Sequence, residues 1–556
     1  MILSRLQYSR LALLLVLVTG ILAPGWAAPA PARQQDAGEL FVGRIRTKST
    51  EERMQLSSLG LDLLELREGD ELFAIMTAAQ AQRLRDEGWQ IAVDEEQTAM
   101  LRQQPTRAFY GGYRSIAEMR AALEEAEARY PHLAEVFVYG RSWEGRDLVG
   151  ISLTNKLRPG PKPTFFLMAG IHARELATPE LALRLVDHLL DGYGSDGDVT
   201  WLLDEHTIIV VPGANPDGHL KVAEGDSPYM QRKNRNTSQG NCAEPPDDWN
   251  QYGVDLNRNS SFKWGGASTS SNPCSLVFKG ASMASEPETQ ALQSLITSLF
   301  PDQRGPADSD AAPADATGIL ISLHSFSDMV LYPWGWTDSP APNGGDLALI
   351  GHKLASYNGY RAGQPGEILY NASGTTDDWS YGELGIASFT FEVGPQSGTC
   401  AGFMPPYSCI DGDGGGRAFW PENRPALLYA ARIARAPYLL IHGPTPESLT
   451  ATVIASNTVE LLAVFDEQYN GGQPITAAEY YVDIPPWRGS VAGSMAPADG
   501  SFSSLNESAV AVIGPIPGRH LIYARGQDAA GNWGPVRAVL VNVPGSSAIW
   551  LPLAAR

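Results

Sequence analysis

An imidazole and a carboxylate that could bind one metal ion, His172 and Glu175, lie three positions apart in the sequence HARE. In a chain with nine histidines, such a pair arises by chance about as often as not, so the spacing alone is a weak signal. The pair directly follows the apolar segment TFFLMAG, and open α/β sheets bind their ligands at the carboxyl ends of strands. We therefore treat it as a candidate metal site.

Three further apolar segments end in polar residues. HTIIVVPGA runs into Asn215 and Asp217, ILISLHS ends at His324, and ASFTFEVG ends near Glu392. Parallel strands bring their carboxyl ends to one edge of a sheet, so we expect two histidines and two glutamates to meet there. Two imidazoles and one carboxylate are the ligands of a catalytic zinc that keeps its fourth position open for water.

The elements that must position these residues are strands alternating with helices. Continuous apolar strands separated by helices predict a mostly parallel sheet covered on both faces. Residues 115–130 are predicted to form an amphipathic helix that opens with a capping box of Ser115 and Glu118. A second helix is predicted to start with Thr178 as its N-cap and Pro179 at its first helical position.

With these motifs in place, the sequence resembles the zinc metallocarboxypeptidases of the pancreatic carboxypeptidase A/B type, most of all their secreted bacterial, carboxypeptidase T-like members. The matching stretches occur in order between Ala108 and about His442: GIHARELATPE, NPDG, QRKNR, GVDLNRN, LHSFSDMVLYPWGW, LYNASGTTDDWSYGELGI and FTFEVG. The resemblance implies the metallocarboxypeptidase fold, one Zn²⁺ per chain, and hydrolysis of the C-terminal peptide bond of peptides and proteins.

The resemblance also implies which residues bind the metal and carry out the reaction. His172, Glu175 and His324 bind the zinc, and Asp255 in GVDLNRN accepts the second N–H of His172, which fixes the tautomer of that ring. Glu392 is the general base that takes a proton from the zinc-activated water and passes it to the leaving amine. A glutamate between two apolar residues of a strand is costly to bury without such a role.

Substrate recognition is implied in the same way. Arg232 in QRKNR matches the arginine that stabilises the carbonyl oxygen as it becomes an oxyanion. Asn257 and Arg258 match the pair that binds the terminal carboxylate, for which the guanidinium fork is well suited. Tyr370 matches the mobile phenol that closes over this carboxylate, and Arg174 matches a residue that contacts the substrate one position upstream.

Substrate preference depends on Asp377 in SGTTDDW, which falls at the floor of the side-chain pocket by resemblance. Family members with an acid there prefer C-terminal Lys or Arg, because a buried carboxylate pairs with a cationic side chain and disfavours neutral ones. In bacterial members the discriminating charge can come from other loops, which would give a mixed preference. Hydrolysis of apolar C-termini or of cell-wall peptides by the same chemistry is a further alternative. An inactive peptide- or surface-binding protein on this fold is disfavoured, because ligands, base, arginine and clamp are all present.

Composition agrees with a folded, acidic protein. The 556 residues are 43% hydrophobic and 19% charged, with a formal net charge of -21. A polyanion of this kind is repelled by phosphate backbones and anionic lipids, so neither nucleic acid nor a membrane is expected as a partner. The length predicts about three domains.

Residues 1–28 are typical of a cleavable secretory signal peptide. Arg5 and Arg10 precede an apolar run from Leu11 to Leu22, and small residues at Ala27 and Ala28 would suit cleavage. A membrane anchor is the alternative, but an apolar run from Leu11 to Leu22 falls short of the ~20 residues that a spanning helix needs. The protein is therefore expected to be secreted and extracellular.

Three regions should follow the signal. Residues 39–98 alternate strand-like and helix-like pieces, which predicts a small α+β domain. The resemblance implies that this domain is propeptide-like, because relatives carry an inhibitory prosegment at this place, and our hypothesis is that it shields the zinc site until cleavage between Arg102 and Arg107. Residues 108–442 form the catalytic domain. Residues 443–545 carry LTATVIAS, VELLAVFDE, AEYYVDIP, HLIYARGQD and RAVLVNVP between turns, which predicts an immunoglobulin- or fibronectin-like β-sandwich. This sandwich would contact glycan or a cell surface, or simply stabilise the chain.

The four cysteines are interpreted as disulfides because of the expected export. Cys242 and Cys274 flank one loop, and Cys400 and Cys409 lie nine positions apart in another. Two local disulfides are the simplest of the three pairings. A zinc knuckle is the competing interpretation, but no CxxC spacing occurs.

Overall fold

The computed structural model of the chain describes residues 40–102, 109–225, 227–247, 249–412, 416–454 and 457–544. The expected signal peptide of residues 1–28, the segment between Arg102 and Arg107 where trimming is expected, and the terminal IWLPLAAR lie outside these residues. Within the described ranges, no helix combines the length and the apolar character needed to cross a membrane.

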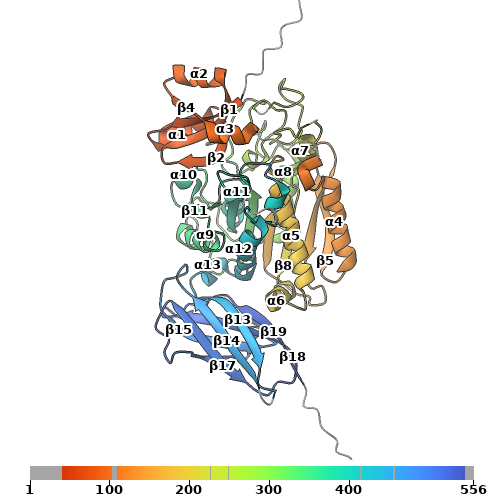
Figure 1. Ribbon diagram of the computed structural model, residues 1–556, viewed down its shortest axis with the longest axis vertical. Coiled ribbons are helices and arrows are strands. Elements are labelled where there is room, and N and C mark those ends of the chain that lie inside the picture. Colours follow the sequence, from red (N-terminus) through yellow and green to blue (C-terminus); the bar gives the residue numbers. More distant parts are fainter. Residues whose placement is uncertain are drawn as a thin grey trace, which may run out of the picture. The chain divides into compact units, whose positions relative to one another are not determined.

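The N-terminal region is an α+β unit, drawn in red in Figure 1. It consists of β1 (Leu40–Arg46), α1 (Thr50–Ser58), β2 (Asp62–Glu68), β3 (Glu71–Thr77), α2 (Ala78–Asp86), β4 (Gln90–Asp94) and α3 (Glu95–Arg102). Its strands pair antiparallel in the order β2-β3-β1-β4. Helix α2 begins at a capping box in which the Thr77 hydroxyl accepts from the Gln80 backbone N–H and the Gln80 side chain accepts from the Thr77 N–H.

The middle of the chain folds around one eight-stranded sheet. Its strands are β5 (Ala134–Arg141), β6 (Asp147–Leu153), β7 (Thr164–Met168), β8 (Thr207–Val211), β9 (Ile319–His324), β10 (Met329–Leu331), β11 (Arg361–Gly363) and β12 (Ala387–Glu392). Its α-helices are α4 (Ile116–Arg129), α5 (Ala177–Gly192), α6 (Gly197–Glu205), α7 (Pro216–Val222), α8 (Pro287–Leu299), α9 (Gly344–Asn358), α10 (Pro365–Ile368), α11 (Thr376–Leu384), α12 (Phe419–Ile433) and α13 (Pro437–Leu440).

The order of this sheet is β11-β10-β12-β9-β7-β8-β6-β5. The central strands β8, β7, β9 and β12 are parallel, whereas β6 and β5 on one side and the β10–β12 pair on the other are antiparallel. The sheet is therefore mixed and mostly parallel, as predicted. The four segments that were expected to end at one edge are its four central parallel strands.

Helices cover both faces of the sheet because successive side chains of a strand point in opposite directions. Phe165 and Leu167 of β7 pack in a cluster with side chains of α4, α5, α9 and α12. The alternate residues Phe166 and Met168 pack in a second cluster with side chains of α8 and α11. Strand β7 is thus buried on both sides, which explains its uninterrupted apolar sequence.

The predicted start of the second helix was wrong in its detail. Helix α5 begins at Ala177, and its N-cap residue makes no side-chain capping bond. The Thr178 hydroxyl instead donates to the Glu175 carbonyl and accepts from the Gly170 N–H. Thr178 does not act as the N-cap of α5, although threonine favours that position, because its hydroxyl connects the loop after β7 to the start of this helix.

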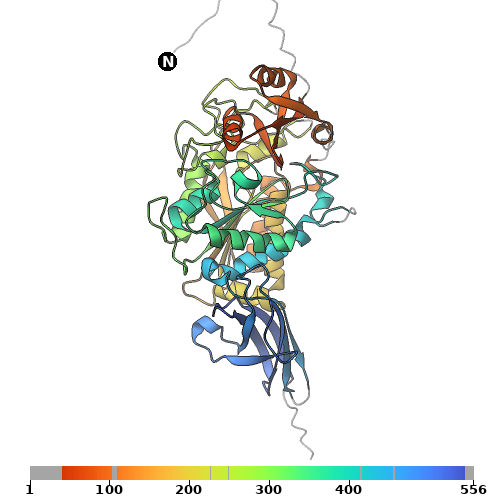
Figure 2. The same cartoon turned by 90° about the vertical axis from the view of Figure 1, so that its left-hand side faces the viewer.

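The C-terminal region is all-β, as expected, and is drawn in blue in Figures 1 and 2. Its strands are β13 (Thr445–Val453), β14 (Val459–Asp466), β15 (Ile475–Val482), β16 (Gly493–Pro497), β17 (Asn506–Ile513), β18 (Gly518–Asp528) and β19 (Arg537–Val543). Strands β16 and β17 were not expected. Strand β16 is a short GSMAP segment that gives no periodic signal, yet it pairs with both β15 and β17 in the sheet order β13-β14-β17-β16-β15-β18-β19.

We expect Gly197→Ala to destabilise the fold, because the new methyl group would lie 2.6 Å from the Ala538 backbone oxygen in β19. Backbone atoms cannot move aside as a flexible side chain can, so the free energy of unfolding should fall by about 1–3 kcal/mol. The matched control is Gly345→Ala in α9, where the methyl meets nothing within 4 Å and should stabilise the helix by about 0.5–1 kcal/mol. Denaturant unfolding measures both, and equal stability of the two variants would contradict this packing.

Candidate active site

Three buried side chains converge at the carboxyl edge of the central strands. His172 and Glu175 lie in the loop after β7, and His324 is the last residue of β9. The His172 Nδ1 atom lies 2.7 Å from Glu175 Oε1 and 3.2 Å from His324 Nδ1, and His324 Nδ1 lies 3.3 Å from Glu175 Oε2. All three residues are at most 2% exposed. The structure therefore brings together the expected ligand set from three separate stretches of chain.

The chemistry of this group fits a bound cation. The Nε2 atom of His172 lies 3.2 Å from Asp255 Oδ1, so the N–H of this ring faces that carboxylate and Nδ1 carries a lone pair. This lone pair points toward a carboxylate oxygen and a second imidazole nitrogen. Among the described residues, Glu175 Oε2 is buried and makes no hydrogen bond; its 3.3 Å contact is with His324 Nδ1. A divalent cation satisfies such converging donors, and two nitrogens with one carboxylate suit zinc.

The charges around this group keep its carboxylates ionised. Burial opposes ionisation of Glu175, but His172 and His324 hold the pKa of that carboxyl below its usual range. Burial also opposes the charge on Asp255, yet Arg232 and His172 hold its pKa well below the usual range. Both carboxylates therefore stay ionised beside the imidazoles.

Glu392 occupies the same edge of the sheet. It is the last residue of β12 and pairs in register with His324 of β9. Its Oε2 atom is buried and has no hydrogen-bond partner among the described residues. Burial raises the pKa of this carboxyl well above its usual range, and the nearby carboxylates of Glu65 and Glu175 raise it further. A carboxyl with a raised pKa beside a metal site can accept and release a proton.

One pocket collects most of the predicted substrate-binding residues. Its lining includes His172, Arg232, Asn257, Arg258, His324, Tyr370, Asp377 and Glu392, together with Glu65 of the N-terminal region. The Arg258 side chain is fixed by bonds from Nε to the Ser268 carbonyl and from Nη1 to the Asn257 carbonyl. The Asn257 amide oxygen accepts from the Thr376 N–H at the start of α11. The pocket therefore has a rigid cationic wall.

Asp377 and Asp378 have different surroundings although they are neighbours in α11. Asp377 lines the pocket and accepts a 3.2 Å hydrogen bond from the Thr390 hydroxyl. Asp378 instead accepts from the backbone N–H groups of Gly335 and Trp336. The structure thus places one carboxylate in the pocket and uses the other to fix the loop after β10.

Among the predicted substrate-binding residues, Arg174 is the one that does not line this pocket. Its guanidinium makes two hydrogen bonds, of 2.8 and 2.9 Å, to the carboxylate of Asp62 in β2. It also lies over the Phe403 ring, 3.9 Å from the centroid. Arg174 is fully buried by these contacts.

The acidic residues of β2 were missed by sequence reasoning. Besides the Asp62 pair, Glu65 accepts a 3.2 Å hydrogen bond from Arg232 Nη1, and both side chains are buried. Residues three apart in a regular strand point to opposite faces, but the pairing of β2 with β3 shifts register between Leu63 and Arg67. This irregularity explains how both acids reach arginines of the catalytic region, and nothing in the sequence signals it.

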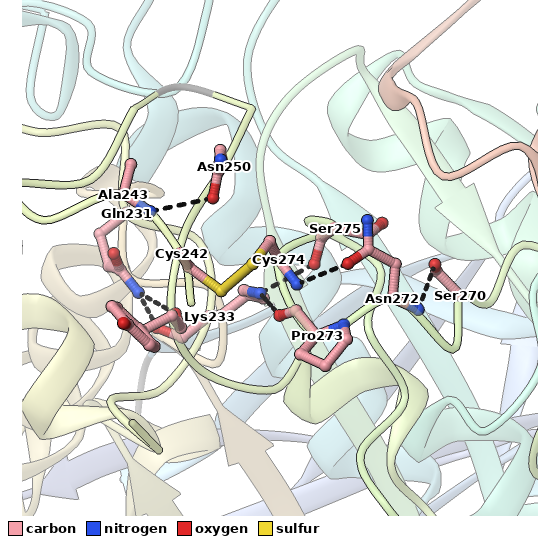
Figure 3. Close-up of a disulfide and its surroundings, with 11 residues drawn as sticks. Gln231, Lys233, Cys242, Ala243, Asn250, Ser270, Asn272, Pro273, Cys274 and Ser275 are labelled. Atoms are coloured by element: carbon pink, nitrogen blue, oxygen red, sulfur yellow. Dashed lines mark hydrogen bonds between the residues drawn. A yellow bond between two sulfur atoms is a disulfide. The ribbon is translucent and has the colours of Figure 1, made fainter. Parts of the chain in front are cut away.

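Both expected disulfides form, Cys242–Cys274 and Cys400–Cys409. Figure 3 shows the first of them beside Lys233, whose Nζ donates to the Pro273 and Ser275 carbonyls at 2.8 Å. Burial lowers the pKa of Lys233 to about 7. The disulfide and these bonds tie together the loops around Arg232.

Comparisons with known proteins identify the family of the chain. The family model described as "Zinc carboxypeptidase" matches residues 119–415. Zinc carboxypeptidase A 1 of Anopheles gambiae is 31% identical over 332 residues, which are 58% of this chain and 70% of that protein. Carboxypeptidase A2 of Mus musculus is 30% identical over 315 residues, which are 55% of this chain and 69% of that protein.

Solved structures support the fold. The carboxypeptidase A of Helicoverpa armigera superimposes with a TM-score of 0.56 at 23% identity, covering 71% of this chain and 98% of that one. Thrombin activatable fibrinolysis inhibitor gives a TM-score of 0.54 at 25% identity, covering 72% of this chain and 99% of that one.

Fold, ligand set and sequence define one class of protein, the metallocarboxypeptidases. The chain belongs to the zinc carboxypeptidase family. It is accordingly a peptide hydrolase with one Zn²⁺, and its substrates are peptides with free C-termini. The His172, Glu175 and His324 group is an arrangement that could hold this ion.

Proposed function

We propose that this protein is a secreted zinc carboxypeptidase that is made as an inactive precursor and removes C-terminal Lys or Arg. The observation that carries the substrate preference is the Asp377 carboxylate in the lining of the pocket that also holds Arg258 and Glu392. Secretion is supported by the signal-like sequence of residues 1–28 and by two disulfides, since disulfides persist in oxidising compartments. Contact of the C-terminal region with glycan or a cell surface stays a prediction.

In the proposed mechanism, the reacting groups are side chains that line the pocket. Bound zinc supplies a Lewis acid that activates water and polarises the scissile carbonyl. Glu392 takes the proton of the attacking water and gives it to the leaving amine, for which its raised pKa suits it. Arg232 donates to the carbonyl oxygen as negative charge develops.

Substrate binding in this mechanism uses the cationic wall of the pocket. Arg258 and Asn257 hold the terminal carboxylate, which favours peptides with a free C-terminus over internal bonds. Tyr370 closes over the bound end and excludes water. Arg174 contacts the residue upstream of the scissile bond once Asp62 has left it.

We expect Glu392→Gln to keep zinc and lose most turnover. Glutamine has nearly the same shape as glutamate but cannot accept the proton, so kcat should fall by on the order of 10²–10⁴-fold. Peptide hydrolysis and zinc content measure the two effects, with the native enzyme assayed in parallel. Turnover within a few-fold of the native enzyme would count against Glu392 as the base.

The preference for basic ends follows from desolvation. The Asp377 carboxylate, at 5% exposure, gains a cationic partner when a Lys or Arg side chain enters the pocket, whereas a neutral side chain leaves its charge uncompensated. The contact from Thr390 fixes one Asp377 oxygen and holds the carboxylate in place.

We expect Asp377→Ile to move the preference toward apolar ends. With peptides ending in Arg, Leu and Phe, kcat/KM for the Arg peptide should fall by on the order of 100-fold, and those for the other two should rise. Asp377→Asn is the matched control, since it removes the charge and keeps the shape. Unchanged selectivity in both variants would mean that another residue sets the preference.

Two buried acid–arginine pairs support the proposal that the uncut protein is an inactive precursor. Asp62 binds Arg174 and Glu65 binds Arg232, so acids of the N-terminal region occupy arginines that the mechanism needs for substrate. Tyr370 packs in an apolar cluster with N-terminal residues such as Leu56 and Leu61. A peptide cannot reach these groups while the N-terminal region stays bound.

We expect the uncut protein to hydrolyse peptides much more slowly than protein cut between Arg102 and Arg107. Asp62→Asn with Glu65→Gln should raise the activity of the uncut form, because each change removes one charge that holds a substrate-binding arginine. Glu68→Gln is the matched control, since this exposed residue of β2 pairs with Arg44 within the N-terminal region. Equal rates for cut and uncut protein would refute the precursor.

A further inference from the structure

Two acidic side chains and a backbone carbonyl meet where the C-terminal strands adjoin the end of the catalytic region. Glu467 directly follows β14, Asp528 is the last residue of β18, and His442 follows α13. Both carboxylates are buried, with Glu467 at 0% and Asp528 at 1% exposure. Nothing in the proposed reaction uses them.

The oxygens of these residues surround one point beside Gly471. A methyl group placed on Gly471 would lie 2.9 Å from the His442 carbonyl oxygen, 3.1 Å from Glu467 Oε1 and 3.6 Å from Asp528 Oδ2. The backbone of Gly471 does not adopt a positive φ, so the turn itself does not demand glycine here. Glycine at this position keeps the space between the three oxygens open.

The Glu467 carboxyl lacks a second partner. Its Oε1 atom accepts a 3.0 Å hydrogen bond from the Gly471 N–H, but its Oε2 atom is buried with no hydrogen bond among the described residues. Burial raises the pKa of this carboxyl to about 8, and Asp528 contributes to the rise. The charge of Lys353 opposes this rise, but its Nζ donates hydrogen bonds to Glu447 and Asp466 and not to Glu467.

The other oxygens are held in fixed positions. Asp528 Oδ1 accepts from the Asn532 backbone N–H at 2.7 Å, and Oδ2 accepts from the Asn532 amide at 2.8 Å. The Asn470 amide donates to the Ile441 carbonyl at 2.8 Å, which fixes the backbone immediately before His442. An arrangement that is rigid before a cation arrives loses little entropy on binding it.

We propose that Glu467, Asp528 and the carbonyl of His442 bind a calcium ion that fastens the C-terminal region to the end of the catalytic region. All of the donors are oxygens, which Ca²⁺ prefers, whereas zinc favours nitrogen and sulfur. Calcium also accepts irregular geometry and completes its shell of six to eight ligands with water, while Mg²⁺ demands a near-ideal octahedron. Two carboxylates balance its charge.

The test measures calcium binding to the zinc-loaded full chain by equilibrium dialysis against ⁴⁵Ca²⁺ in buffer freed of calcium. The variants are Glu467→Gln and Asp528→Asn, which keep the side-chain shape and each remove one charge. The matched control is Glu460→Gln, an exposed glutamate on β14. Thermal unfolding of all four proteins, with and without Ca²⁺, provides a second measurement.

The proposal predicts one saturable calcium per chain in the native protein and in Glu460→Gln. Affinity should fall by at least about tenfold in Glu467→Gln and in Asp528→Asn, and the rise in unfolding temperature with Ca²⁺ should disappear in both. Should one variant fail to fold, the other still decides. No saturable binding up to millimolar Ca²⁺, or unchanged affinity in a folded variant, would overturn the site and leave Glu467 as a buried neutral acid.

Discussion

The whole site depends on the parallel pairing of β7, β9 and β12. Side chains alternate along a strand, so a shift of one residue in the β9–β12 register would turn Glu392 away from His324. The correct register places the imidazole and carboxylate groups close enough together to coordinate one ion, in a buried region that excludes water. Two imidazole nitrogens and a carboxylate placed in this way are a ligand set that suits zinc.

Because the site is buried, each of its arginines needs an anionic partner. A buried guanidinium is costly without an anionic partner, and the catalytic region buries Arg174, Arg232 and Arg258. Asp62 and Glu65 are partners for the first two in this structure. In the proposed mechanism, the substrate and the developing oxyanion replace Asp62 and Glu65 as partners of these arginines. The inhibitory contacts and the catalytic contacts would therefore use the same guanidinium groups.

Much of this could be predicted because it is local or because it recurs at strand ends. The capping box of Ser115 and Glu118 that opens α4 follows from a few adjacent residues, and the metal ligands follow from strands that end at one edge. The start of α5 could not be predicted, since Thr178 bonds across the loop to Gly170. The short strand β16 carries no periodic pattern, and its place is set only by its neighbours in the sheet.

The contacts between the N-terminal acids and the buried arginines could not be predicted from the sequence. Asp62 reaches Arg174 across more than a hundred residues, and a register shift in β2 decides where both acids point. Sequence patterns report which side chains a segment carries, but not which distant segment packs against them. The same holds for the oxygens around Gly471, which come from three segments that only the fold assembles.

The most direct test of the zinc site is an anomalous diffraction map recorded at the zinc absorption edge from crystals of the purified protein. The account predicts one strong peak bounded by His172 Nδ1, His324 Nδ1 and the Glu175 carboxylate. A map without a peak at that position, or side chains that point away from one another, would contradict it.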